Sequence, residues 1–246
     1  MYGLLIAFTR LLNELFGGLI TSVVDKLGIH PVHPAAPIRP VHALEIFVAL
    51  ILLLFFVMVR LTLNVERPGK IQHLAEMIHE FVNGQAEAIF GHHGYEPHLP
   101  FVTTILLFVL LCNCLGLLPH IETPTSDPVV PLGIAILTFL YYNLHGVLKQ
   151  GPVGYLKHFM GPMWWLAPLM FPIEIISHLA RIMSLTVRLY ANMFASDLLT
   201  LVFFSLVPIA IPIIFLGLHF GVALIQAYVF MLLAMIYLAE ATAQEH

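Results

Sequence analysis

The sequence predicts an all-α integral membrane protein with about five membrane helices and further amphipathic helices at the membrane surface. Of its 246 residues, 60% are hydrophobic and only 10% are charged, whereas a soluble globular domain carries about 25% charged residues. A mean hydropathy of +0.94 leaves too little polar surface to cover a water-soluble globule. The formal net charge of −4 gives no indication of nucleic-acid binding.

Long apolar runs mark the individual spans, because a bilayer requires about 20 apolar residues per helix. The five predicted spans lie at about 41–63, 99–118, 129–147, 166–207 and 213–240. Together they are expected to form a single membrane domain over residues 41–246.

The N-terminal segment, residues 1–40, is expected to lie outside the membrane interior. Its apolar residues recur at helical spacing at Leu4, Phe8, Leu11, Leu12, Leu15 and Leu19. Arg10, Asn13 and Glu14 interrupt this run, which argues against a cleavable signal peptide and favours an amphipathic surface helix. A second short amphipathic helix is expected at about 71–82.

The last two helices are too long to span a bilayer upright. Residues 173–207, between Pro172 and Pro208, contain neither Gly nor Pro, and about 35 helical residues extend about 53 Å against a hydrocarbon core of about 30 Å. The proline-free run 213–240 would extend about 42 Å. Helices of this length tilt steeply or leave the bilayer, so we expect a strongly tilted helical hairpin.

The polar residues of the first long helix lie on one side of it. At about 100° per residue, an arc of about 120° contains Glu174, Ser177, His178, Arg181, Ser184, Arg188, Asn192 and Ser196. Asp197 falls on the opposite face. On the second long helix, His219, Gln226 and Tyr237 share one stripe within about 20°.

Arg188 is the central candidate residue. An arginine in the middle of a membrane helix costs about 2.5 kcal/mol on insertion scales, and it keeps its charge. A fixed cation repels protons, so Arg188 would separate two half-pathways and lower the pKa of a partner's carboxylate. His178 and His219 have either a packing or a proton-path role, and Glu174 and Gln226 on the same stripes favour the proton path.

The residues around Arg188 carry a family resemblance. Residues 184–193, S-L-T-V-R-L-Y-A-N-M, resemble the S-L-x-x-R-L-x-x-N-M signature of ATP synthase a subunits, and residues 219–237 are similar to the last helix of that family. Residues 111–119, L-C-N-C-L-G-L-L-P, and 124–127, P-T-S-D, resemble the N-x-x-x-L-x-P and P-T-x-D elements of that family. The resemblance extends over about residues 40–246.

The resemblance implies a proton channel in the Fo sector of a rotary ATP synthase. It implies that Arg188 faces the carboxylate of a rotating c-subunit ring. The other positions that the resemblance assigns to the channel are its polar neighbours Asn192 and Gln226, the half-channel residues Glu174, Asp197 and His219, and the outer-entrance residue Asp127. No catalytic residue, cofactor or metal is implied, because the ATP chemistry of such complexes occurs on other subunits.

The expected partners and location follow from the same resemblance and from the loop charges. The partners are the c ring, the b subunits of the peripheral stalk and the remaining subunits, and the ion is H⁺ or Na⁺. Loops 65–98 and 149–163 contain Lys or Arg and loop 119–128 contains neither, which places the N-terminus outside and the C-terminus in the cytoplasm. The short loops favour a bacterial inner membrane.

Other classes of membrane protein explain only part of the pattern. A cytochrome b-like electron carrier would use paired histidines as axial ligands, but seven of the fourteen histidines lie in the hydrophilic stretches 30–33 and 73–98. A secondary transporter would explain the intramembrane charge but requires more spans or a repeated half. A purely anchoring subunit leaves the polar stripe without a purpose.

Overall fold

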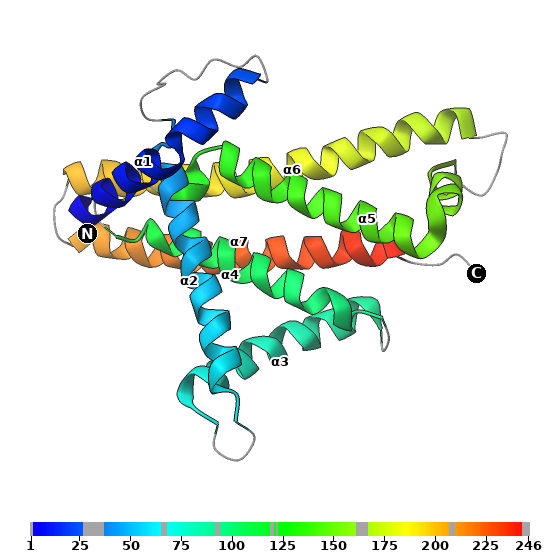
Figure 1. Cartoon of the computed structure of the whole chain (residues 1–246), viewed down its shortest axis with the longest axis horizontal. Helices are drawn as coiled ribbons and strands as arrows, with labels where there is room; N and C mark the ends of the chain where they lie inside the picture. Colours follow the sequence, from blue (N-terminus) through cyan, green and yellow to red (C-terminus); the bar gives the residue numbers. More distant parts are fainter. Residues whose placement is uncertain are drawn as a thin grey trace.

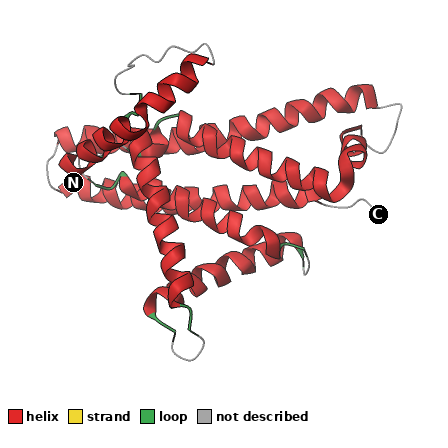
Figure 2. Ribbon diagram, in the orientation of Figure 1, coloured by secondary structure: helices red, strands yellow, loops and turns green. Residues whose placement is uncertain are grey.

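The protein is built from helices. The computed structural model describes residues 2–26, 37–64, 68–91, 94–118, 121, 123–160, 167–206 and 210–242, and within these ranges every regular element is helical (Figure 2). The elements are α1 (Tyr2–Lys26), α2 (Pro40–Thr62), α3 (Lys70–Phe90), η1 (Glu96–His98), α4 (Leu99–Leu115), η2 (Pro124–Ser126), α5 (Val129–Met160), α6 (Ala167–Leu206) and α7 (Ala210–Thr242).

Five of the described helices are long and apolar enough to cross a membrane, as predicted. These spans are Pro40–Thr62, Glu96–Leu115, Val129–Gly151, Pro168–Ser205 and Ile213–Thr242. The amphipathic helix predicted at 71–82 also forms, as the longer α3.

The last two helices, α6 and α7, run at a steep angle to α2, the first span (Figure 1). In Figure 1, α5, α6 and α7 run side by side along the long axis of the molecule, and α2 crosses them. The 23 residues of α2 extend about 35 Å, which matches a bilayer crossed nearly upright. The 40 residues of α6 extend about 60 Å, so α6 fits the same bilayer only when strongly tilted.

Some helix ends differ from the sequence expectation. The helix α6 runs from Ala167 to Leu206, close to the predicted 166–207, and includes Pro172, whose ring removes one backbone hydrogen bond within the helix. The helix α7 begins at Ala210, which puts Pro212 in the first turn, where no helical hydrogen bond is lost. The helix α5 continues beyond residue 147 and bends at Gly151, whose φ of 74° favours glycine.

The packed centre of the molecule determines which side of α6 faces outward. Its fully buried residues come from α3 to α7 and include Val82, Val109, Ala135, Leu189, Met193, Met231 and Met235. Tight van der Waals packing is the main attraction between helices in a bilayer. Because Leu189 and Met193 point into this core, the residues before them, Arg188 and Asn192, lie at its edge.

The N-terminal helix is attached to the start of the first span. The Asn13 side chain accepts a hydrogen bond from the Ile38 N–H and donates one to the Ile38 carbonyl, each at 3.0 Å. The rings of Phe8 and Phe47 meet edge to face with centroids 6.0 Å apart. The predicted helix is therefore confirmed, and its position at a membrane surface stays a prediction.

Candidate functional site

Arg188 lies on α6 at the boundary between the packed and the open side. Leu185 and Leu189 are buried, whereas Val187 and Ser184 are exposed. The guanidinium Nη2 of Arg188 donates a hydrogen bond to Ser184 Oγ at 3.4 Å, which is longer than most such bonds. Within the described residues, no carboxylate lies within ion-pair distance of Arg188. Its charge is therefore available to a group on another protein.

Two amides flank the arginine without internal partners. Asn192 is exposed one helical turn after Arg188, and Gln226 is half-buried on α7. Over the part of the chain that the structure describes, neither amide side chain has a hydrogen-bond partner. A polar amide in a membrane helix requires a partner or water, so both positions are suited to contact water or a neighbouring subunit.

A buried polar cluster surrounds Asp197 near the end of α6. Asp197 Oδ1 accepts a hydrogen bond from the Thr123 hydroxyl at 2.8 Å and lies 3.5 Å from His219 Nδ1. The Ser196 hydroxyl lies 2.9 Å from the same His219 nitrogen. The His219 side chain is only 1% exposed, whereas that of Asp197 is 28% exposed. The carboxylate therefore links a buried imidazole to the surface of the chain.

The same cluster extends into α4 and the η2 turn. Asn113 is fully buried, and its Oδ1 accepts a hydrogen bond from the Thr125 hydroxyl at 2.6 Å. Its backbone carbonyl lies 3.3 Å from His219 Nε2. A Cβ on Gly116 would overlap Thr123 Oγ1 and would lie 3.1 Å from His219 Nε2. We name this group, Asn113, Thr123, Thr125, Ser196, Asp197 and His219, the Asp197 cluster.

A second polar site lies toward the opposite end of α6. His178 is buried; its Nδ1 lies 2.8 Å from the Tyr142 hydroxyl on α5, and its Nε2 lies 3.5 Å from Glu174 Oε1. The Glu174 side chain is 29% exposed. Glu174 and His178 border a small, partly open pocket, which is also lined by Tyr155, Arg181, Glu240 and Ala241 and which we name the Glu174 pocket.

The Glu174 pocket also contains an ion pair between Arg181 and Glu240, and the hydroxyl of Tyr155. Arg181 Nη2 donates a hydrogen bond to Glu240 Oε1 of α7 at 2.8 Å, and the guanidinium carbon lies 5.0 Å from the centre of the Tyr237 ring. The Tyr155 hydroxyl, beyond the bend in α5, donates a hydrogen bond to Asn143 Oδ1 at 2.7 Å. Burial raises the pKa of Tyr155 to about 12, so Tyr155 is a neutral hydroxyl at physiological pH.

Asp127 lies outside the Asp197 cluster. Its Oδ2 forms an ion pair with Arg39 Nη2 at 2.9 Å, and its Oδ1 accepts a hydrogen bond from the Val129 N–H at 3.1 Å. The carboxylate thus caps the start of α5 and ties it to the start of α2. Its predicted role at an outer entrance stays a prediction.

The sites are arranged in order along the hairpin. Arg188 lies ten residues after His178 and nine before Asp197, which corresponds to about 15 Å and about 13 Å along α6. The helices α6 and α7 pack together, and polar contacts connect them at the Glu174 pocket and at the Asp197 cluster. Gln226 lies between these contacts along α7, as Arg188 does along α6. A permanent cation therefore separates two carboxylate–imidazole groups.

Some residues of these sites were not selected from the sequence. Among them are Asn113, Thr123, Thr125, Tyr142 and Glu240. Asn113 and Thr125 lie within the two motifs that resemble the family elements. Glu240 falls about 40° from Gln226 on the α7 stripe, so helical periodicity continued by one turn predicts it. The hydroxyls of Thr123 and Tyr142 give no such signal.

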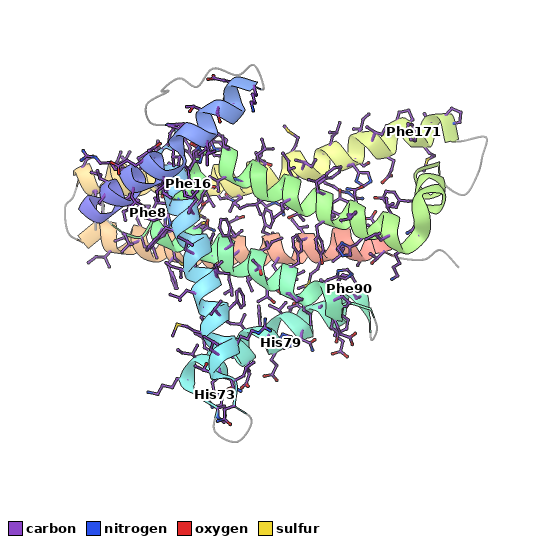
Figure 3. All side chains as sticks on the ribbon, viewed as in Figure 1. Phe8, Phe16, His73, His79, Phe90 and Phe171 are labelled. Atoms are coloured by element: carbon purple, nitrogen blue, oxygen red, sulfur yellow. The ribbon has the colours of Figure 1, made fainter. Side chains whose placement is uncertain are left out.

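Histidines elsewhere in the chain do not suggest a metal centre. Figure 3 shows His73 and His79 on α3, well apart from Phe171 on α6. The His98 and His145 rings meet edge to face, and His98 Nδ1 lies 3.1 Å from the Tyr141 hydroxyl. Among the described residues, no group of three or more His, Cys, Asp or Glu side chains could hold a metal ion.

The fold and the site together define a class of protein. Five candidate spans, a mid-helix arginine and two carboxylate–imidazole groups along a tilted hairpin are the features of a multi-pass membrane protein that moves ions. The model of the ATP synthase A chain family matches residues 42–239. The chain therefore belongs to the ATP synthase A chain family.

Individual relatives agree with this assignment. The chain is 51% identical over 239 residues to ATP synthase subunit a of Koribacter versatilis, with 97% of each chain covered. It is 47% identical over 203 residues to ATP synthase subunit a of Solibacter usitatus, covering 82% of this chain and 87% of the relative. It is 43% identical over 171 residues to that of Bdellovibrio bacteriovorus, covering 70% and 74%. The predicted family is confirmed, and none of these matches favours a cytochrome or a secondary transporter.

Proposed function

We propose that this chain is the stationary proton-channel subunit of the Fo sector of an F-type ATP synthase. In this role it conducts protons to and from a ring of c subunits, and so couples proton flow to rotation and ATP synthesis. It carries out no ATP chemistry itself. Its membership of the ATP synthase A chain family supports the proposal.

The observation that carries the proposal is the unpaired charge of Arg188. Burying a guanidinium in a bilayer without a partner is costly, and the described residues provide no carboxylate for it. A carboxylate on a c subunit would provide the missing charge as it passes. The cation would lower the pKa of that carboxylate and release its proton.

The two polar sites supply routes on either side of the cation. The Asp197 cluster, with His219, would load a ring carboxylate from one face of the membrane. The Glu174 pocket, with His178, would accept the released proton on the other face. Asn192 and Gln226 would hydrogen-bond to the ring carboxylate or to water between these routes. Because Arg188 repels protons, direct flow between the routes is blocked, and the proton must travel on the ring.

The same proposal fixes the orientation. The basic residues of loops 65–98 and 149–163 favour the cytoplasmic side for both. The N-terminus then lies outside, the C-terminus in the cytoplasm, the Asp197 cluster toward the outer face and the Glu174 pocket toward the inner face. We place the chain in a bacterial inner membrane, with residues 1–40 outside the membrane interior, the outer entrance near Asp127 and the b subunits of the peripheral stalk among its neighbours.

A site-specific crosslink tests the proposed partner. A photo-activated crosslinking residue at Asn192, exposed one turn from Arg188, should capture a small membrane protein with one mid-span Asp or Glu. The same residue at Leu53, 61% exposed on α2, is the matched control and should not capture it. Capture of that protein from Leu53 but not from Asn192 would contradict the proposal.

A further inference from the structure

Two arginines lie on the polar stripe of α6, and the structure treats them differently. Arg181 lies seven residues before Arg188, which is two helical turns or about 10 Å along the axis. Arg181 has an ion pair with Glu240 at 2.8 Å. Arg188 has no ion pair within the described residues. The difference requires an explanation, since both cations lie on the same stripe.

The surroundings of Arg181 neutralise its charge. Its side chain is 18% exposed, and its Nη2 donates to the Glu240 carboxylate across the α6–α7 interface. The face of the Tyr237 ring, 5.0 Å from the guanidinium carbon, adds a cation–π attraction. Both partners come from α7, one turn apart. The helix α7 therefore places an anion, Glu240, opposite Arg181 of α6.

The ion pair between Arg181 and Glu240 lies at the Glu174 pocket, where its charge affects protons. Arg181 and Glu240 line the same pocket as Glu174 and His178, the pair proposed to accept the released proton. An uncompensated cation there would repel protons by the same physics that makes Arg188 a barrier. An acid that cancels the charge would keep the pocket open to protons.

We infer that Glu240 is a charge-compensating residue that cancels Arg181 at the inner pocket, so that Arg188 alone acts as the barrier on α6. The inference rests on the proposed function and deepens it. Glu240 is a positioning residue here, because it acts on the proton path through the charge of Arg181. A purely structural role, as a tie between α6 and α7, is the competing explanation.

A comparison of single and double neutralising variants separates the two explanations. The variants E240Q, R181Q and the double variant R181Q/E240Q would be expressed in the complete complex, and ATP-driven acidification of inverted membrane vesicles would be measured per assembled complex. E240Q removes the acid that pairs with Arg181 and adds one net positive charge to the pocket, which is expected to slow pumping about tenfold. The double variant restores the net charge of the pocket and is expected to recover to within about twofold of the wild-type rate.

The outcomes decide the inference in either direction. A structural tie is lost in the double variant as well as in E240Q, so a double variant as slow as E240Q overturns the inference. Wild-type pumping in E240Q overturns it too. The variant E80Q, which neutralises an exposed glutamate on α3, is the matched control and should pump normally. Failure of the wild-type complex to pump would contradict the proposed function itself, whereas normal wild-type pumping with either overturning result contradicts this inference alone.

Discussion

The Thr123 hydroxyl of the loop before η2 donates a hydrogen bond at 2.8 Å to Asp197 Oδ1 of α6. The same carboxylate oxygen lies 3.5 Å from His219 Nδ1. The Thr123 side chain is fully buried, and these contacts hold one carboxylate oxygen beside the imidazole. A loop residue thus orients the only acid of the Asp197 cluster.

Replacing Thr123 by valine should slow proton flux while the fold is kept. Valine has nearly the same shape but no hydroxyl, so Asp197 loses a hydrogen bond to its charged form, and a slowing of about tenfold is expected. Serine at the same position keeps the hydroxyl and should retain most of the rate. ATP-driven pumping in vesicles measures both variants. Equal rates for T123V and the wild type would show that the hydrogen bond has no role in transport.

Replacing Gly116 by alanine should disrupt the Asp197 cluster by crowding. The added Cβ would overlap Thr123 Oγ1 and press on His219 Nε2, and overpacking of this kind costs about 1–3 kcal/mol. We expect a lower thermal midpoint of the solubilised complex together with slower pumping. The control is Gly217→Ala on α7, where an added Cβ meets nothing within 4 Å. A G116A complex as stable and as active as G217A would contradict this packing.

Replacing Gln226 by alanine should slow the flux without abolishing it. Its amide lies between the two polar sites and has no hydrogen-bond partner among the described residues, so it is available to a proton-carrying group or water. Loss of one such hydrogen bond is expected to reduce the rate about threefold to tenfold. Ile225, exposed on the neighbouring face, provides the control I225A, which should pump at the wild-type rate. Indistinguishable rates for Q226A and I225A would remove Gln226 from the path.

Periodicity selects Arg188 as a candidate because the polar stripe depends only on residue spacing within one helix. The polar stripe, the overlong helices and the five spans all depend on residue spacing along a single segment, and the structure has them where spacing placed them. The predicted start of α6 at about residue 166 agrees with the observed start at Ala167, and Pro172 is accommodated inside the helix.

The contacts of the Asp197 cluster are not predicted by residue spacing along a helix. Angles on α6 alone separated Asp197 from the stripe that includes Ser196, yet His219 of α7 approaches both side chains. The position of Thr123 depends on how the loop before η2 folds back against α4, which spacing along a helix does not contain. Contacts between helices, and contacts that loops make with helices, are therefore seen only in the three-dimensional structure.

The most direct test of the central claim is the pumping activity of the Arg188→Ala variant. Its assembly would be measured by co-purification with the other subunits, and its function by ATP-driven acidification of inverted vesicles. Without the permanent cation, the ring carboxylate keeps its proton and the two routes are no longer separated, so we predict assembled complexes with no coupled pumping. Assembled R188A complexes that acidify vesicles at the wild-type rate would contradict the account.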